Sequence, residues 1–273
     1  MALKDLLVFV DTGASKAGSY GLSLAAACGA SLTAAVPVVE PSLPPHLPAE
    51  LSEDLLARIR EDAEASADKA IQEFSHAARQ IGRSIEVARF KAIAGEVGDG
   101  LSRLARCFDT VILPQPDPDG VDSSDLIEAC LFGAGRPLIV VPYIPIREEI
   151  GSVMIAWDGG VPAARAVADA LPFLTLARRV EVVTATKGEN ARLHLMEKNL
   201  VRHLARHGIQ AEATSLPVDE IDVADMLLSH AADSGVDLMV MGGYGHSRFR
   251  EAVLGGTTRE VLRSMTIPVL MSH

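Results

Sequence analysis

The sequence predicts two α/β domains in tandem, each with a mostly parallel sheet flanked by helices. Short, continuous apolar runs alternate with Ala-rich or amphipathic helical patterns along the 273 residues of the chain. Strands that are apolar on both faces are typical of parallel sheets covered by helices. The same order of elements also occurs twice, and each half is therefore expected to read β-α-β-α-β-α-β.

An internal repeat sets the number of domains. Each half begins with a short apolar run that ends in an aspartate, Asp11 in the first half and Asp158 in the second. An Ala-rich helical pattern follows in both halves, and the last strand of each half begins on a proline. We expect domains over residues 1–147 and 148–273. The paired segments are residues 6–11 with 153–158, 18–28 with 163–176, 109–113 with 237–241, and 137–142 with 268–271.

The stretch from Asp11 to Asp109 in the first half is longer than the matching stretch from Asp158 to Asp237 in the second. The additional residues lie in a proline-rich stretch, 37–48, and in a long helical pattern over residues 51–74 with apolar residues at three- and four-residue intervals. We interpret this pattern as an ordinary amphipathic helix after a long loop. A lid or a partner-binding arm is the alternative.

Composition and charge exclude several classes of protein. A formal net charge of −11 and 4% aromatic residues do not fit a nucleic-acid binder, which needs a basic face and stacking side chains. No apolar run approaches the ~20 residues that span a bilayer, and no secretory pattern opens the sequence. The three cysteines, Cys28, Cys107 and Cys130, are widely spaced, so we expect core residues in a reducing cytoplasm and neither disulfides nor a zinc site.

Glycines and threonines near the C-terminus form the candidate ligand site. They follow the apolar run 238–241 and lead into a predicted helix. Backbone N–H groups at glycines are not shielded by side chains, and a helix N-terminus adds donors and a partial positive charge. Such a segment can hold phosphate groups. The residues concerned are Gly242, Gly243, Gly245, His246, Gly255, Gly256, Thr257 and Thr258.

Structural roles are the alternative for single members of this set. Gly255 fits the left-handed cap that ends the preceding helical pattern. Thr257 with Glu260 three residues later fits a capping box. His246 either contacts phosphate, accepts a phosphoryl group, or is a solvated loop histidine.

The strand-Asp-helix order at the start of each half and the spacing Gly242-x2-Gly245-x9-Gly255 resemble a tandem universal stress protein. This resemblance covers the whole chain. It implies Rossmann-like domains of the adenine nucleotide α-hydrolase type, each with a five-stranded sheet. It also implies ATP as the ligand in some members and no nucleotide in others. In nucleotide-binding members the residue matching Asp158 lies near the adenosine, and residues matching the three glycines surround the phosphates.

The chain departs from the family pattern in both halves. In the second half Gly256 stands where the family has Ser or Thr directly after its last glycine, and Thr257 follows one residue later. In the first half Pro114, Gln115 and Asp117 replace the glycines. Proline has no N–H to donate and a carboxylate repels phosphate, so we expect at most one ATP per chain.

No catalytic residue is predicted. The sequence contains no P-loop, GxSxG, HExxH or CxxC motif, and no general base is evident beside the glycines. His203 and His207 lack a third ligand, so no metal is expected. Any ATP hydrolysis or autophosphorylation is expected to be slow, and a hydrolase or transferase on the related fold lacks a nucleophile.

Two functional hypotheses follow. The leading one is a cytoplasmic stress-response protein that binds adenine nucleotide in its second half and acts as a regulatory module. The alternative is a nucleotide-free structural or interaction protein, in which the glycines only make turns. In both, the halves are expected to pack as a pseudo-twofold pair, and a homodimer of whole chains is a further option.

Overall fold

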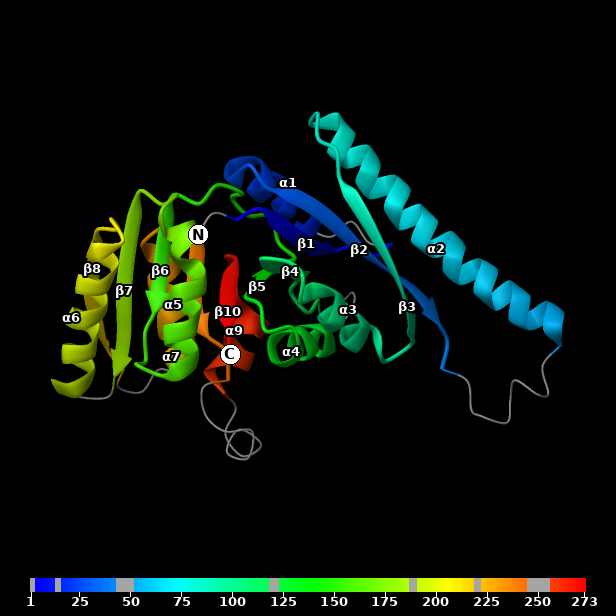
Figure 1. Cartoon of the computed structure of the whole chain (residues 1–273). Coiled ribbons are helices and arrows are strands. Elements are labelled where there is room, and N and C mark those ends of the chain that lie inside the picture. Colours follow the sequence, from blue (N-terminus) through cyan, green and yellow to red (C-terminus); the bar gives the residue numbers. More distant parts are fainter. Residues whose placement is uncertain are drawn as a thin grey trace.

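The strands of both halves join one continuous sheet. The computed structural model describes residues 3–12, 16–42, 52–117, 123–186, 191–218, 222–244 and 256–273. Within these residues the sheet has 10 strands in the order β3-β2-β1-β4-β5-β10-β9-β6-β7-β8. Each half contributes five parallel strands, as the family resemblance implies, and the halves meet at β5 and β10 in the middle of Figure 1.

Among the described residues, each half has five strands and four helices in alternation. In the first half these are β1 (Asp5–Phe9), α1 (Lys16–Cys28), β2 (Ser31–Glu40), α2 (Glu53–Gln80), β3 (Glu86–Ile93), α3 (Val97–Ala105), β4 (Thr110–Pro114), α4 (Ser124–Gly133) and β5 (Leu138–Val141). In the second half they are β6 (Ser152–Ala156), α5 (Val161–Leu174), β7 (Arg179–Thr186), α6 (Ala191–Arg206), β8 (Ala211–Pro217), α7 (Val223–Asp233), β9 (Leu238–Gly242), α9 (Thr257–Ser264) and β10 (Val269–Ser272).

The alternation deduced from apolar runs was wrong by one strand in each half. The strands that lack such a run are β3 and β8, which form the two outer edges of the sheet. Along both strands no residue is fully buried, and exposed residues alternate with half-buried ones. An edge strand with this pattern lacks the continuous apolar run of a central parallel strand.

The antiparallel pairing of β5 with β10 joins the two halves. Ile139 lies opposite Leu270, with Val140 opposite Val269 and Leu138 opposite Met271. Ile139 and Leu270 stand at equivalent positions of the two halves, so a pseudo-twofold axis passes between them. This is the pseudo-twofold pair that the repeat predicts. The proposed domain boundary at residues 147–148 falls in the connection between β5 and β6 and stays a prediction.

Two apolar cores cover the two faces of the sheet and run through both halves. One lies beneath α1, α2, α5 and α6, and the other beneath α3, α4, α7 and α9. Alternate strand residues feed the two cores: Leu6 and Val8 of β1 face the first, and Leu7 and Phe9 face the second. Because both cores cross the β5–β10 seam, the halves are held together by continuous apolar packing as well as by the strand pair.

Equivalent aspartates fix the start of the first strand in each half. Asp109 Oδ2 accepts hydrogen bonds from the N–H groups of Lys4 at 2.7 Å and Asp5 at 3.0 Å. Asp237 Oδ2 accepts from Gly151 at 2.9 Å and Ser152 at 2.8 Å. The two carboxylates therefore make the same contact, which gives the sequence repeat a structural counterpart.

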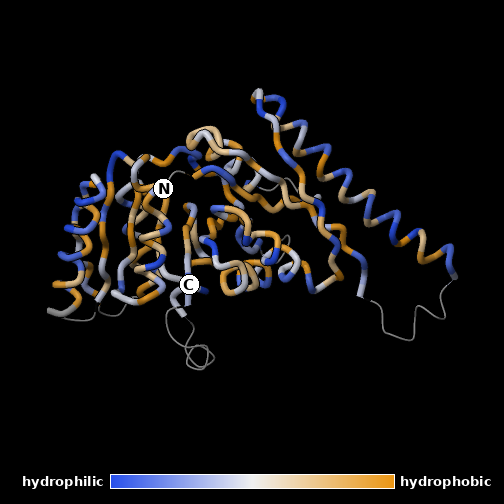
Figure 2. The backbone as a smooth tube through the Cα atoms, viewed as in Figure 1, coloured by the Kyte–Doolittle hydropathy of each residue, from blue (hydrophilic) through white to orange (hydrophobic). Residues whose placement is uncertain are grey.

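The long helical pattern of the first half is helix α2. The Ser52 side chain accepts the N–H of Leu55 at its N-terminus. A buried stripe that includes Ala63, Ala67 and Phe74 packs into the first core, and Figure 2 shows apolar and polar segments alternating along the helix. In Figure 1 the helix forms a long arm at the outer edge of the first half.

Gln115 makes a contact between the halves that the sequence did not reveal. Its side chain is 2% exposed, and Nε2 donates to the carbonyl groups of Leu262 at 2.9 Å and Arg263 at 3.2 Å, near the end of α9. Its Oε1 accepts the N–H of Tyr143 at 3.3 Å. The residue that replaces a glycine of the ligand motif thus ties the first half to the last helix of the second.

Replacing Gln115 with alanine is expected to lower the free energy of unfolding by about 1–3 kcal/mol, because buried carbonyl and N–H groups lose their partners. Urea unfolding measures the change. Gln80→Ala, which removes an exposed glutamine from α2, is the matched control and should change the value by less than about 0.5 kcal/mol. Equal effects of the two substitutions would contradict the assigned role of Gln115.

Candidate functional site

The predicted ligand residues that the structure describes gather at one edge of the sheet. Strands β6 and β9 are parallel neighbours, with Ala156 opposite Met241. Asp158 follows the first of these strands and Gly243 follows the second, so both lie at the carboxyl ends of the strands. Open α/β sheets bind ligands in this position. Three predicted site residues, Gly245, His246 and Gly255, lie outside the described residues.

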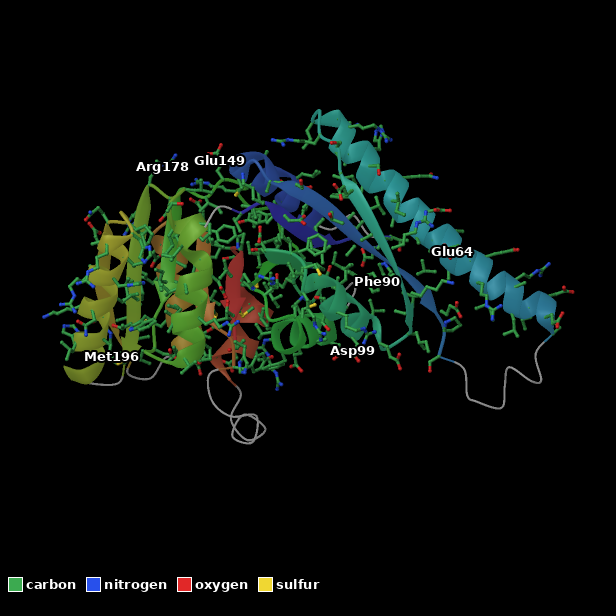
Figure 3. All side chains as sticks on the ribbon, viewed as in Figure 1. Glu64, Phe90, Asp99, Glu149, Arg178 and Met196 are labelled. Carbon is green, nitrogen blue, oxygen red and sulfur yellow. The ribbon has the colours of Figure 1, made fainter. Side chains whose placement is uncertain are left out.

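Asp158 stands in the turn that opens α5. Its side chain is exposed, and Oδ1 accepts the N–H of Gly160 at 2.7 Å. Gly160 is the N-cap of α5, and Gly159 before it has a left-handed φ of 75°. Met196 of α6, labelled in Figure 3, packs against Gly159. A Cβ atom on Gly159 would lie only 2.8 Å from the methionine Cε. The turn therefore fixes the carboxylate beside the N-terminus of α5.

Gly242 allows the first turn of α5 to contact the end of β9. A Cβ atom on Gly242 would lie 2.5 Å from the backbone N of Ala163 and 2.8 Å from the carbonyl carbon of Pro162. Any larger residue would push the helix away from the strand. This glycine therefore has a packing role whether or not a ligand is present.

Gly243 is buried at the contact between the halves. A Cβ atom there would lie 2.7 Å from Cδ2 of Leu131 on α4, and its N–H donates to the carbonyl of Ser272 at 2.9 Å. The expectation that the glycine turn leaves its N–H groups bare was therefore wrong for Gly243, because the parallel ladder with β10 continues one residue past the strand. The next N–H, of Tyr244, donates to Thr258 Oγ1 at 3.1 Å.

Helix α9 begins at Thr257, with Gly256 as its N-cap and no side-chain cap. The capping box of Thr257 with Glu260 is therefore not formed: Thr257 is already helical, and the Gly256 carbonyl accepts the N–H groups of Arg259 at 2.9 Å and Glu260 at 3.3 Å. The N–H groups of the first turn have no acceptor within the helix by its geometry. Gly256 and Thr257 are half-buried, whereas Thr258 is buried beneath Tyr244.

Tyr244 belongs to this region, and its place between two glycines was the only signal for it in the sequence. Its φ of 50° is left-handed and its side chain is 8% exposed. The hydroxyl donates to Glu128 Oε1 of α4 at 3.1 Å. Burial, and then the neighbouring Glu128 carboxylate, raise the pKa of Tyr244 to about 12.

The first half keeps a cleft at its own carboxyl edge, with a different lining. The cleft has a volume of ≈ 450 Å³ and lies between the ends of β1 and β2 and helix α2. Its polar lining residues are Asp11, Thr12, Asp62 and Ser66, and none of the described residues that line it is basic. Two carboxylates without a basic residue disfavour a phosphate ligand.

The remaining sequence expectations concern metals, membranes and cysteines. Among the described residues no group of three or more His, Cys, Asp or Glu is arranged to hold a metal ion. In the same part of the chain, no helix combines the length and apolar character needed to cross a membrane. The three cysteines are free, and Cys130 is buried. Cys107 is exposed, so its assignment to the core was wrong.

Alanine at Gly242 is expected to lower the free energy of unfolding by about 2–3 kcal/mol, because the new methyl group meets the backbone of α5. Gly243→Ala is the matched control, since its methyl group meets only the flexible end of Leu131, and about 1 kcal/mol is expected. Neither glycine has a positive φ, so available space alone decides the difference. Urea unfolding of both variants measures it, and the reverse order of stability would contradict the packing role of Gly242.

The raised pKa of Tyr244 predicts a loss of stability at high pH. The folded state keeps the phenol proton up to a pKa of about 12, whereas the unfolded state loses it near the ordinary value of 10.0. Between these values the unfolded chain binds fewer protons, so the free energy of unfolding falls as pH rises. Urea unfolding between about pH 9 and 11 should show a shallower fall for Tyr244→Phe than for the unmodified protein. Parallel curves would contradict the prediction.

Relatives in sequence and structure agree on one family. Residues 150–273 match the universal stress protein family. Universal stress protein Slr1230 from Synechocystis sp. is 46% identical over 193 residues, which are 68% of this chain and 65% of that protein. Universal stress protein YxiE from Bacillus subtilis (strain 168) is 36% identical over 77 residues, which are 27% of this chain and 48% of that protein. The chain thus spans less than two thirds of the length of either relative.

Solved structures share the fold over nearly the whole chain. A universal stress protein from Archaeoglobus fulgidus DSM 4304 has a TM-score of 0.74 at 14% identity, covering 97% of this chain and 94% of its own. A protein from Pseudomonas aeruginosa UCBPP-PA14 has a TM-score of 0.59 at 18% identity, covering 98% of this chain and 92% of its own. At these identities the likeness shows the fold alone, with two copies of it in one chain. The match of residues 150–273 to the family and the 46% identity with Slr1230 over 68% of this chain show that the chain belongs to the universal stress protein family.

Proposed function

We propose that the chain is a stress-response regulatory protein that binds one adenine nucleotide, ATP, in its second half. The observation that carries the proposal is the placement of two helix N-termini and Asp158 at the carboxyl edge of the second half. Helix α5 begins beside Asp158, and α9 begins at Thr257, with Gly256 as its N-cap and no side-chain cap. Helix N-termini attract anions through their free N–H groups and partial positive charge.

The adenosine end of the nucleotide is assigned to Asp158. Its carboxylate is exposed and is held by the N–H of Gly160. A carboxylate in this position accepts hydrogen bonds from hydroxyl groups of a ribose. Trp157, the only tryptophan of the chain, directly precedes it.

The phosphate end is assigned to the first turn of α9. Since the N–H groups of Gly243 and Tyr244 already have acceptors, the donors left among the described residues of the motif are those of Gly256, Thr257 and Thr258, with the Thr257 hydroxyl. Gly242 contributes by bringing α5 into contact with this region. The predicted contacts of Gly245, His246 and Gly255 remain part of the proposal.

The first half is proposed to bind no nucleotide. It has Pro114 and Gln115 where the second half has Gly242 and Gly243, and the Gln115 side chain is committed to α9. We also propose a cytoplasmic location and no contact with nucleic acid or membranes. Hydrolysis of the bound ATP is proposed to be slow at most, because no general base is identified beside the site in the part of the chain that the structure describes.

A nucleotide-free structural or interaction protein is the second candidate. One observation favours it: Gly242 and Gly243 are both needed for packing, against α5 and Leu131 respectively. Glycines retained for packing need no ligand to explain them. Surfaces of the pseudo-dimer, or a homodimer of whole chains, would then carry the function.

Titration of the protein with Mg-ATP separates the two candidates. Because Trp157 is the only tryptophan and adjoins Asp158, its fluorescence should change with saturation at one ATP per chain, and calorimetry should give the same stoichiometry. Asp158→Ala should weaken ATP binding about tenfold, which is the effect of losing one hydrogen bond to a charged group.

The equivalent residue of the first half supplies the control. Asp11→Ala removes the same charge from the other carboxyl edge and should leave ATP affinity unchanged. Absence of ATP binding at millimolar concentration would refute the nucleotide proposal and favour the second candidate.

A further inference from the structure

Tyr244 has a backbone conformation that needs support from its surroundings. It is the single non-glycine residue with a positive φ among the described residues, at 50°. A bulky side chain rarely adopts this conformation without compensating contacts. The contacts that hold Tyr244 therefore determine how the chain leaves β9.

Those contacts come from both halves of the molecule. Within the second half, the Tyr244 N–H donates to Thr258 Oγ1 at 3.1 Å. From the first half, Glu128 Oε1 accepts the tyrosine hydroxyl at 3.1 Å. Phe132, one turn further along α4, packs against the ring with centroids 5.4 Å apart. Tyr244 thus connects α4 of the first half to the first turn of α9.

Glu128 also faces Arg259, and the two residues stand at equivalent positions. Each lies the same number of residues before the last strand of its half, Leu138 or Val269. Their side chains approach across the pseudo-twofold axis, with Arg259 Nη2 3.9 Å from Glu128 Oε1. Two identical subunits would bring two like residues together here. Opposite charges at this place require two halves that have diverged within one chain.

We infer that Glu128, in the half that lacks the phosphate motif, is a positioning residue for the nucleotide site of the other half. It fixes the hydroxyl of Tyr244, and Tyr244 in turn fixes Thr258 in the first turn of α9. The N–H groups of that turn are the donors assigned to phosphate, so the inference rests on the proposed function. The Glu128 carboxylate does not contact the ligand in this scheme.

The hydrogen bond to Tyr244 explains why a carboxylate stands at position 128. The side chain of Glu128 is 46% exposed, so it contributes little to the apolar core. Its exposed pairing with Arg259 is also a weak source of stability. The hydrogen bond to a buried tyrosine of the glycine turn is the contact that places Glu128 at the site.

The test measures ATP affinity by Trp157 fluorescence and calorimetry in the full chain. Tyr244→Phe and Glu128→Ala should each weaken ATP binding about five- to tenfold, which is an ordinary size for the coupling between a distant residue and a binding site. Glu128→Gln keeps an oxygen acceptor for the tyrosine hydroxyl, and its ATP affinity should remain within about twofold of that of the unmodified protein. The double variant Tyr244→Phe with Glu128→Ala should be no weaker than either single variant, because both remove one interaction.

Glu73→Ala is the matched control for the lost charge. Glu73 is an exposed glutamate of α2 whose partner is Lys69, and its removal should leave ATP affinity unchanged. Urea unfolding of every variant separates affinity from stability.

The possible results separate the positioning role of Glu128 from the proposed binding of ATP. Unchanged ATP affinity in Glu128→Ala and Tyr244→Phe, with or without a loss of stability, would overturn the inference and leave the proposed function standing. A loss in Glu128→Gln as large as in Glu128→Ala would also overturn it, because charge and not the hydrogen bond would then be responsible. No ATP binding by the unmodified protein would overturn both statements.

Discussion

The antiparallel pairing of β5 with β10 is the contact on which the rest of the molecule depends. It merges two parallel sheets into one, and both apolar cores continue across the seam, one through Ile139 and Leu270 and the other through Val140 and Val269. It also places α4 and α9 on either side of the pseudo-twofold axis. Without this pairing, neither Gln115 nor Glu128 would reach the second half, and the end of β9 would lack its support from the first half.

Fusion of the two halves allows equivalent positions to take different roles. Gln115 and Gly243 both donate their N–H to the last strand of their own half. The glutamine side chain then reaches the end of α9. The glycine, which has no side chain, instead allows Leu131 to pack directly against its backbone. In a symmetric dimer one residue type would have to serve both contacts. The glutamine that stands in the first half at the position of Gly243 therefore provides a specific contact between the halves.

The order of strands and helices was largely predictable because it depends on local patterns. The central strands have apolar runs, and the internal repeat predicted the pseudo-twofold pair of halves that the pairing of β5 with β10 shows. The edge strands β3 and β8 were missed because solvent on one side removes that signal. The hydrogen bonds of the site were not predictable, since the partners of Gly243 and Tyr244 are Ser272, Thr258 and Glu128, which are distant in the sequence. Pattern and spacing identify glycines but do not reveal which N–H groups remain available.

A glycine motif indicates phosphate binding only where its N–H groups remain available to a ligand. Gly242 is required by the approach of α5 and Gly243 by the approach of α4, and the N–H of Gly243 already has an acceptor. The presence of these two glycines is therefore explained by packing alone. The first turn of α9 differs, because its N-cap is a glycine without a side chain and its N–H groups have no acceptor within the helix. Nucleotide binding, as proposed, thus depends on α9 and on the residues of both halves that hold its first turn in place.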